Sequence, residues 1–227
     1  MKNNIKFFIK EIIDIVISFI ILLLFLPIMM IICILIKIDS PGPILFKQKR
    51  VGKNLQKFEI FKFRTMTHSI INTNESVMHL NEASGPVFKI KNDPRLTKIG
   101  KFLRKTSIDE IPQIFNVLKG DMSFVGPRAI LYNHNDIIEM RTKNDVHKLI
   151  PGITGWAQIN GRDDISAFDK VMLDTEYLKK RSMWFDLKIL WITFFKVLRR
   201  LHGHQTRREN VPISLECRKK LNEIEGN

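Results

Sequence analysis

The sequence predicts a mixed α/β protein that is attached to a membrane through its N-terminal segment. Residues Ile12 to Ile36 are almost wholly apolar, as in a membrane segment. Residues Ile44 to Met66 alternate in places between apolar and charged side chains, which indicates strands. Apolar residues between Ile111 and Leu118 recur at the spacing of one buried helix face.

The composition narrows the class of protein. The chain has 227 residues, of which 44% are hydrophobic, enough for one globular domain with an attached segment. Its formal net charge of +14 implies an anionic partner, which is a membrane surface, a nucleic acid or a phosphorylated substrate. Cys33 lies in the apolar run and Cys217 in a polar tail, so we expect neither a disulfide nor a zinc site. This use of cysteine fits a protein that faces the reducing environment of the cytoplasm.

The apolar run is long enough to cross a bilayer, but its flanks favour a helix that enters and returns. Pro27, near the middle, removes one helical hydrogen bond and bends the axis. Basic residues flank the run on both sides: Lys2, Lys6 and Lys10 before it, and Lys37, Lys47, Lys49, Arg50 and Lys53 after it. Because basic flanks tend to stay cytoplasmic, a re-entrant helix-break-helix is favoured over a kinked single span, which remains the alternative.

Asp14 is a charged residue inside the apolar run, where contact with lipid would be costly. It is expected at the membrane interface. There it either pairs with Lys10 one helical turn earlier, or with a later basic residue, or it is solvated. The sequence does not choose between pairing and solvation.

Turn signals divide the next part of the chain. The Ser-Pro-Gly-Pro sequence at 40–43 ends the membrane segment. Gly52-Lys53-Asn54 predicts a hairpin turn between short strands that carry basic residues on one face. Thr67 to Asn92 is polar and aperiodic, which indicates a loop or a substrate-facing insert, and Leu96 to Leu103 predicts a short helix.

A central helix is predicted to begin at Ser107, which can form a capping box with Glu110. Pro112 would disturb its first turn, and Gly120 suits its C-cap. Asp109 and Glu110 would then lie at the positive end of the helix dipole, which favours their ionised forms.

Two further helices are predicted toward the C-terminus. One covers Ser166 to Lys180. The other, Trp184 to Leu198, carries large apolar residues with cations near one edge, and it lies either in the membrane interface, which is favoured, or in the core. The predicted organisation is a membrane segment at 1–38, a domain at 39–201 and a loose polar tail at 202–227.

Two adjacent carboxylates are the most informative feature. Asp109 and Glu110 follow Arg104 and Lys105, and a Gly-Pro-Arg turn comes after the helix. A carboxylate can act as a nucleophile or a metal ligand, and arginine binds phosphoryl oxygens well, so the pattern predicts chemistry on a phosphate. Simple helix capping by the acids is the alternative. The cations expected to contact phosphate are Arg104, Arg128, Arg95, Lys62 and Arg64.

Other kinds of site lack their sequence patterns. The chain contains no G-x-x-x-x-G-K-[ST], no G-x-G-x-x-G and no G-x-S-x-G, and its histidines show no zinc-ligand spacing. The basic residues are not interleaved with stacking aromatics, and a nucleic-acid binder would not need an apolar anchor. We therefore expect no nucleic-acid partner.

Five segments carry a family resemblance. They are the apolar run with Pro27, FKQKRVGKN at 46–54, FEIFKFRTM at 58–66, NDPRLTKIGKFLRKTSIDEIPQIFNVLKGDMSFVGPR at 92–128, and PGITGWAQINGR at 151–162. In this order they resemble the bacterial initiating sugar-phosphate transferases, the monotopic phosphoglycosyl transferases, in their minimal form. The chain departs from the family where Leu26 replaces a frequent serine before Pro27, and where Ala129 replaces a proline after Arg128.

The resemblance implies a small membrane-associated α/β catalytic domain on the cytoplasmic face of the bacterial inner (plasma) membrane, with a re-entrant helix and amphipathic interfacial helices. It implies transfer of a sugar-1-phosphate from a UDP-sugar to polyprenyl (undecaprenyl) phosphate with release of UMP, at the start of surface-glycan assembly. Asp109 would be the nucleophile, esterified during the reaction, and a ligand of Mg²⁺. Glu110 would be its partner in proton handling. Membrane lipid is a further expected partner, and a homodimer is left open.

Two other functions compete with this one. A non-catalytic membrane-anchored scaffold would explain the charge and the anchor, but not the acid pair. A glycosyltransferase that moves only the sugar would release UDP, so the nucleotide product separates the two enzymes. The sequence identifies neither the sugar nor the glycan pathway.

Overall fold

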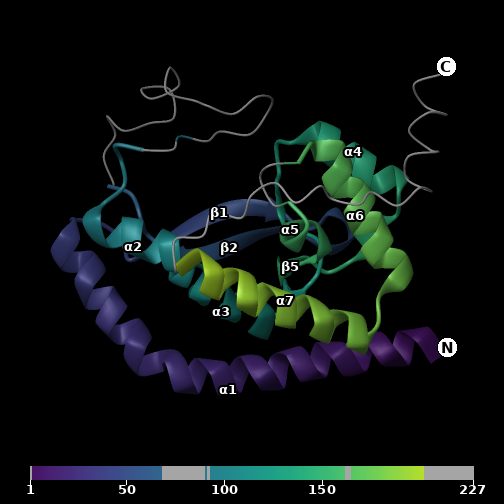
Figure 1. Ribbon diagram of the computed structural model, residues 1–227, viewed down its shortest axis with the longest axis horizontal. Helices are drawn as coiled ribbons and strands as arrows, with labels where there is room; N and C mark the ends of the chain where they lie inside the picture. Colours follow the sequence, from purple (N-terminus) through teal and green to yellow (C-terminus); the bar gives the residue numbers. More distant parts are fainter. Residues whose placement is uncertain (1, 68–89, 91–92, 162–164, 202–227) are drawn as a thin grey trace.

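A computed structural model describes residues 2–67, 90, 93–161 and 165–201 (Figure 1). Most of the predicted loop from Thr67 to Asn92 lies outside the described residues, and so does the tail at 202–227. Within the described part, a long helix runs beneath a domain of two small sheets and surrounding helices (Figure 1). The mixed α/β class is confirmed.

The larger sheet has three antiparallel strands in the order β2-β1-β4. These are β1 (Leu45–Val51), β2 (Lys57–Phe63) and β4 (Ile130–Leu131). A short 3₁₀ turn at Lys53–Leu55, with Asn54 at φ 53°, joins β1 to β2 and confirms the predicted hairpin turn. Asparagine tolerates this left-handed conformation better than most residues.

Basic residues lie on both faces of the β1–β2 hairpin, so the prediction of one basic face is wrong. Lys47 pairs with Phe61 across the strands, and Arg50 pairs with Phe58. Because successive strand residues point to opposite faces, Arg50 and Lys62 share one face and Lys47 lies on the other. The register, which the sequence alone does not supply, separates these cations.

A second, two-stranded sheet pairs β3 (Ser123–Val125) in parallel with β5 (Gly152–Thr154). The domain helices are α2 (Lys98–Thr106), α3 (Ile114–Leu118), α4 (Asn135–Lys143), α5 (Trp156–Ile159), α6 (Ala167–Lys180) and α7 (Met183–Leu201), with 3₁₀ helices η3 (Ile108–Gln113) and η4 (Val146–Lys148). The predicted helices at 96–103, 166–180 and 184–198 are therefore confirmed with shifted ends.

The central helix differs from its prediction. Ser107 has φ 58° and ends α2, and its side chain makes no capping hydrogen bond among the described residues. The Glu110 N–H donates instead to the Ser107 carbonyl at 3.2 Å. The predicted capping box is therefore wrong. Pro112 lies in the 3₁₀ helix η3, and the α-helix begins only at Ile114, while Gly120 at φ 80° follows its end as expected for a C-cap glycine.

Helix α1 (Lys2–Asp39) runs continuously through Pro27 and curves around one side of the domain (Figure 1). This differs from the predicted helix-break-helix, because a gently curved helix can tolerate one missing hydrogen bond. Asp14 and Ser18 in its first half are buried, and so are Met29 and Ile36 in its second half. All six residues from 23 to 28 are exposed, which covers every side of the helix at 3.6 residues per turn.

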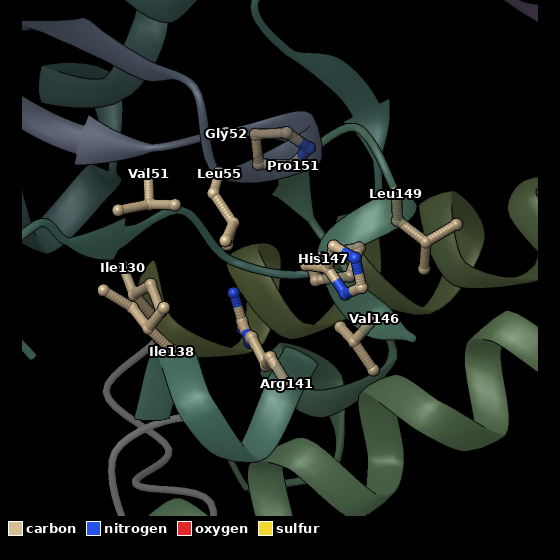
Figure 2. Close-up of a pocket in the computed structure, with 11 residues that line it drawn as sticks. Val51, Gly52, Leu55, Ile130, Ile138, Arg141, Val146, His147, Leu149 and Pro151 are labelled. Atoms are coloured by element: carbon tan, nitrogen blue, oxygen red, sulfur yellow. The ribbon is translucent and has the colours of Figure 1, made fainter. Parts of the chain in front are cut away.

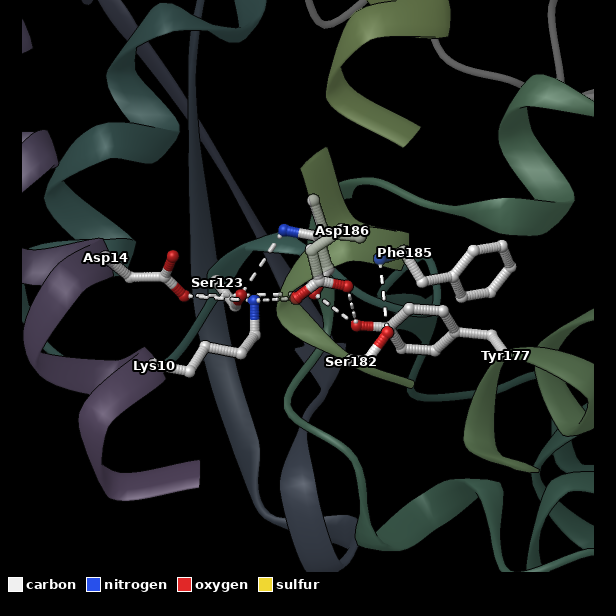
Figure 3. Close-up of polar contacts among 8 residues, drawn as sticks. Lys10, Asp14, Ser123, Tyr177, Ser182, Phe185 and Asp186 are labelled. Carbon is white, nitrogen blue, oxygen red and sulfur yellow. Dashed lines mark hydrogen bonds and ion pairs between the residues drawn. The ribbon is translucent and has the colours of Figure 1, made fainter. Parts of the chain in front are cut away.

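A buried polar network fastens the first half of α1 to the domain (Figure 3). Lys10 Nζ lies 3.5 Å from Asp14 Oδ2 and 2.8 Å from Asp186 Oδ2. The Ser123 hydroxyl donates to Asp14 at 2.6 Å, and the Tyr177 hydroxyl donates to Asp186 at 2.7 Å. The predicted Lys10–Asp14 pair is confirmed, and because Asp14 is only 7% exposed, the solvated alternative is wrong.

Helix α7 is amphipathic. Ile189 is fully buried in a core cluster with Val125 and Tyr177, whereas Trp184 is 83% exposed and Trp191 is 66% exposed. A helix of the core would bury its aromatic residues, so this pattern favours the interfacial interpretation. Contact of this face with lipid stays a prediction.

Candidate active site

The turn before Arg128 depends on close backbone contact between two segments. The Gly152 N–H donates to the Pro127 carbonyl at 2.9 Å. A Cβ atom on Gly126 would lie 2.4 Å from the Ile150 carbonyl oxygen, which leaves no room for a side chain. The glycine therefore allows the segment from β3 to Arg128 to approach the segment that enters β5.

The acid pair lies in the first turn of η3, which packs against β2. Lys62 Nζ, from β2, lies 2.7 Å from Glu110 Oε1. Arg128 Nη2 lies 3.5 Å from the same oxygen. Asp109 interacts electrostatically with both Arg104 and Lys62. The structure thus brings together five of the predicted site residues from three separate segments of the chain.

Arg50 is a sixth member that the sequence did not single out. Its Nη1 donates to the Ala129 carbonyl at 3.0 Å. Burial and the nearby charge of Arg128 lower the pKa of Arg50 to about 10, and Glu110 opposes this effect. Arg50 remains a cation at neutral pH. The available signal was its place in the FKQKR segment, but only the strand register puts it on the face of Lys62.

Arg104 reaches the acid pair from the last turn of α2. Its Nε donates to the Thr65 hydroxyl at 2.9 Å, which fixes the guanidinium beside the end of β2. This bond leaves other guanidinium nitrogens that can turn toward a phosphate.

Arg95 and Arg64 are engaged in structural contacts. Arg95 forms a bidentate ion pair with Asp93, with Nε 2.9 Å from Oδ1 and Nη2 2.6 Å from Oδ2. Arg64 is 5% exposed and donates to the carbonyls of Pro41 at 2.8 Å and Ser40 at 2.6 Å, just after α1 ends. These contacts explain both residues without a ligand, and phosphate binding by either stays a prediction.

The residues present fit a magnesium ion that is shared with a substrate. Among the described residues, no three His, Cys, Asp or Glu side chains are grouped closely enough to hold a metal by themselves. Mg²⁺ is commonly bound by one or two carboxylates together with substrate phosphates and water. Asp109, with Glu110 beside it, offers such a partial ligand set, and a bound Mg²⁺ would offset negative charge on a diphosphate.

Fold and site together define an α/β protein with one long apolar helix and an acid pair surrounded by cations. The part of α1 from Phe8 to Asp39 is long and apolar enough to cross a membrane, by length and composition. The chain belongs to the bacterial sugar transferase family, whose sequence model matches residues 5–200.

Several curated relatives are similar to this chain. A UDP-glucose:undecaprenyl-phosphate glucose-1-phosphate transferase of Escherichia coli is 43% identical over 190 residues, covering 81% of this chain and 39% of the relative. An undecaprenyl-phosphate galactose phosphotransferase of Salmonella typhimurium is 41% identical, covering 85% and 41%. A galactosyl transferase of Streptococcus agalactiae is 44% identical, covering 69% and 35%. The chain spans about two fifths of the length of these relatives.

Proposed function

We propose that this protein transfers a sugar-1-phosphate from a UDP-sugar to undecaprenyl phosphate or a related polyprenyl phosphate, with release of UMP. The observation that carries the proposal is the adjacent pair Asp109 and Glu110 with Lys62 and Arg128 directed at it. Phosphoryl transfer depends on positioned groups and on cations that offset developing charge. The names of the relatives supply the substrate classes, and they include both glucose and galactose, so the sugar stays open.

The reaction proceeds in two displacements at one phosphorus atom. A carboxylate oxygen of Asp109 attacks the sugar-bearing phosphorus, and the bond to UMP breaks with its electron pair leaving on UMP. A phosphate oxygen of the polyprenyl phosphate then attacks the same phosphorus. The bond to Asp109 breaks, the carboxylate is restored, and a sugar diphosphate lipid is released.

Glu110 organises the groups around this nucleophile. It accepts from Lys62 and Arg128, so it holds two phosphate-binding cations beside Asp109 before substrate arrives. A phosphate monoester has a second pKa of about 6, so some of the acceptor carries a proton at neutral pH. Glu110 is the carboxylate placed to take that proton as the acceptor attacks.

We propose a re-entrant placement of α1 on the cytoplasmic face of the bacterial inner membrane, and the contacts of the helix support the part of this proposal that puts both of its ends on one side. Lys10 pairs with Asp186 in α7, and Glu11 lies 3.5 Å from Lys53 in the β1–β2 turn. At the other end of the helix, Asp39 accepts from the Ile99 N–H at 2.9 Å. Both halves therefore meet the same domain. Residues 23–28, which are exposed on every side of the helix, are the part that enters the bilayer most deeply in this placement.

The test combines product identity with one substitution. Purified protein is given a UDP-sugar panel, Mg²⁺ and undecaprenyl phosphate, and UMP release is measured. We expect UMP with at least one sugar, and we expect Asp109→Asn to abolish both release and covalent labelling by the sugar phosphate. Asp136→Asn, an exposed residue of α4, serves as the matched control and should retain activity. UDP as product would indicate a glycosyltransferase, and no nucleotide product would favour the scaffold.

A further inference from the structure

The turn that carries Arg128 is held by another arginine, Arg141. Arg141 of α4 donates from Nη1 to the Arg128 carbonyl at 2.8 Å. Its Nη2 donates to Asp174 Oδ2 of α6 at 2.7 Å. The Arg141 side chain is 11% exposed and that of Asp174 only 2%, so the ion pair is buried. The guanidinium therefore connects a fixed carboxylate to the backbone of a site residue.

The next peptide is held in a similar way from a different element. Arg50 of β1 donates to the carbonyl of Ala129, so two consecutive carbonyls each accept from a guanidinium. Figure 2 shows Arg141 extending from α4 into an open pocket that Val51 of β1 also lines. Val51 and Arg50 point to opposite faces of β1, so the two arginines approach the turn from opposite sides.

Backbone pairing holds the turn on both sides of Ala129. A β-bridge joins Arg128 to Gly152, and β4 pairs with β1 from Ile130 onward. Between these two pairings, Ala129 has no ring to restrict φ, and the two guanidinium groups hold the carbonyls on either side of its α-carbon. The direction of the Arg128 side chain is set by the orientation of its own peptide, and that peptide is anchored by Arg141.

Stability alone does not account for the buried pair. Removing two charges from water is costly, and well-packed apolar residues at such positions are often as stable or more so. An ion pair that also bonds a site backbone has a geometric role that apolar residues could not supply.

We infer that Arg141 and Asp174 are positioning residues for Arg128. Asp174 orients the Arg141 guanidinium, and Arg141 orients the peptide that aims Arg128 at Glu110 and the donor diphosphate. This inference rests on the proposed function, in which Arg128 binds that diphosphate.

The test is a double-mutant cycle on kcat/KM for the UDP-sugar. The paired change Arg141→Met with Asp174→Leu removes both charges, so no unpaired carboxylate is left buried. We expect about a tenfold loss of kcat/KM, the usual effect of one lost hydrogen bond to a charged group, with little change in the thermal unfolding midpoint. In an Arg128→Ala background the same pair should cause almost no further loss, because the residue it positions is gone. Lys143→Met, on the exposed face of α4, is the control and should change neither.

The outcomes are distinct. If the losses multiply in the Arg128→Ala background, Arg141 and Asp174 act independently of Arg128 and the inference is overturned, while the proposed function stands. If the wild-type protein releases no UMP, the proposed function is wrong, and the inference that rests on it is overturned as well. If the paired variant unfolds, Arg141→Lys replaces it in the cycle. Lysine keeps a cation for Asp174 but cannot bond Asp174 and the Arg128 carbonyl with two separate nitrogens.

Discussion

Lys62 forms the shortest ion pair of the described cluster, and its side chain is only 16% exposed. Burial lowers the pKa of Lys62, and the charge of Glu110 opposes that effect. Desolvation disfavours the ammonium form, so this lysine releases its proton at a lower pH than a lysine in water. In the proposed function the ammonium form is the one that binds phosphate.

We predict that the alkaline limit of activity depends on Lys62. Since the active form is the protonated one and its pKa is lowered, kcat/KM should fall as pH rises, at a pH below the ordinary lysine pKa. Lys62→Arg keeps the charge to higher pH and should move the limit upward, although its different shape lowers the maximal rate. A kcat/KM profile across the alkaline range is the measurement. Lys119→Arg, exposed at the end of α3, should leave the limit in place.

Single residues also show where sequence reasoning stops. The sequence shows directly that Asp109 and Glu110 are adjacent and that cations lie near them along the chain. Arg64 and Arg95 could not be told from phosphate ligands, because a guanidinium binds a backbone carbonyl or a carboxylate with the same donors as a phosphate. Deciding between these uses requires knowing that α1 ends beside Arg64 and that Asp93 stands against Arg95.

Among the elements, α1 combines two environments, since its two halves pack on the domain and its middle is exposed. The polar network of Lys10, Asp14 and Asp186 fastens its first half to the domain. Burial and the neighbouring Asp186 raise the pKa of Tyr177, so its hydroxyl stays a donor to that carboxylate. The network joins α1 to α7 through Lys10, to β3 through Ser123 and, by way of Asp186, to α6 through Tyr177.

Lys10→Met should loosen α1 from the domain. The change leaves Asp14 and Asp186 buried without their cation, which costs about 3 kcal/mol of unfolding free energy. Lys53→Met provides a matched control, because it breaks a second ion pair between α1 and the domain. That pair is roughly half exposed, so its loss should cost less than about 1 kcal/mol. Thermal unfolding in one detergent compares the two, and equal losses would contradict the assigned role of the network.

The sequence predicted most elements of the whole molecule but not how they meet. Apolar runs and periodicity located α1, the hairpin, α6 and α7, because those signals depend on neighbouring residues only. The start of the central helix was misplaced because Ser107 can cap a helix or end one, and the left-handed conformation that decides this comes from packing. Arg50 and Arg141 were missed because strand register and helix packing, which are long-range, bring them to the turn.

The placement of the whole molecule in the membrane gives the last prediction. If α1 enters the bilayer and returns, residues near both of its ends face the cytoplasm. In a background with Cys33→Ser and Cys217→Ser, we expect a membrane-impermeant thiol reagent added to intact cells to label neither Asn4→Cys nor Asn54→Cys. Both should react once the inner membrane is permeabilised. A cysteine exposed in the periplasm is labelled in parallel as the positive control. Labelling of the Asn4 variant alone in intact cells would indicate a single span, which would require α1 to leave its contacts with Asp186 and Lys53.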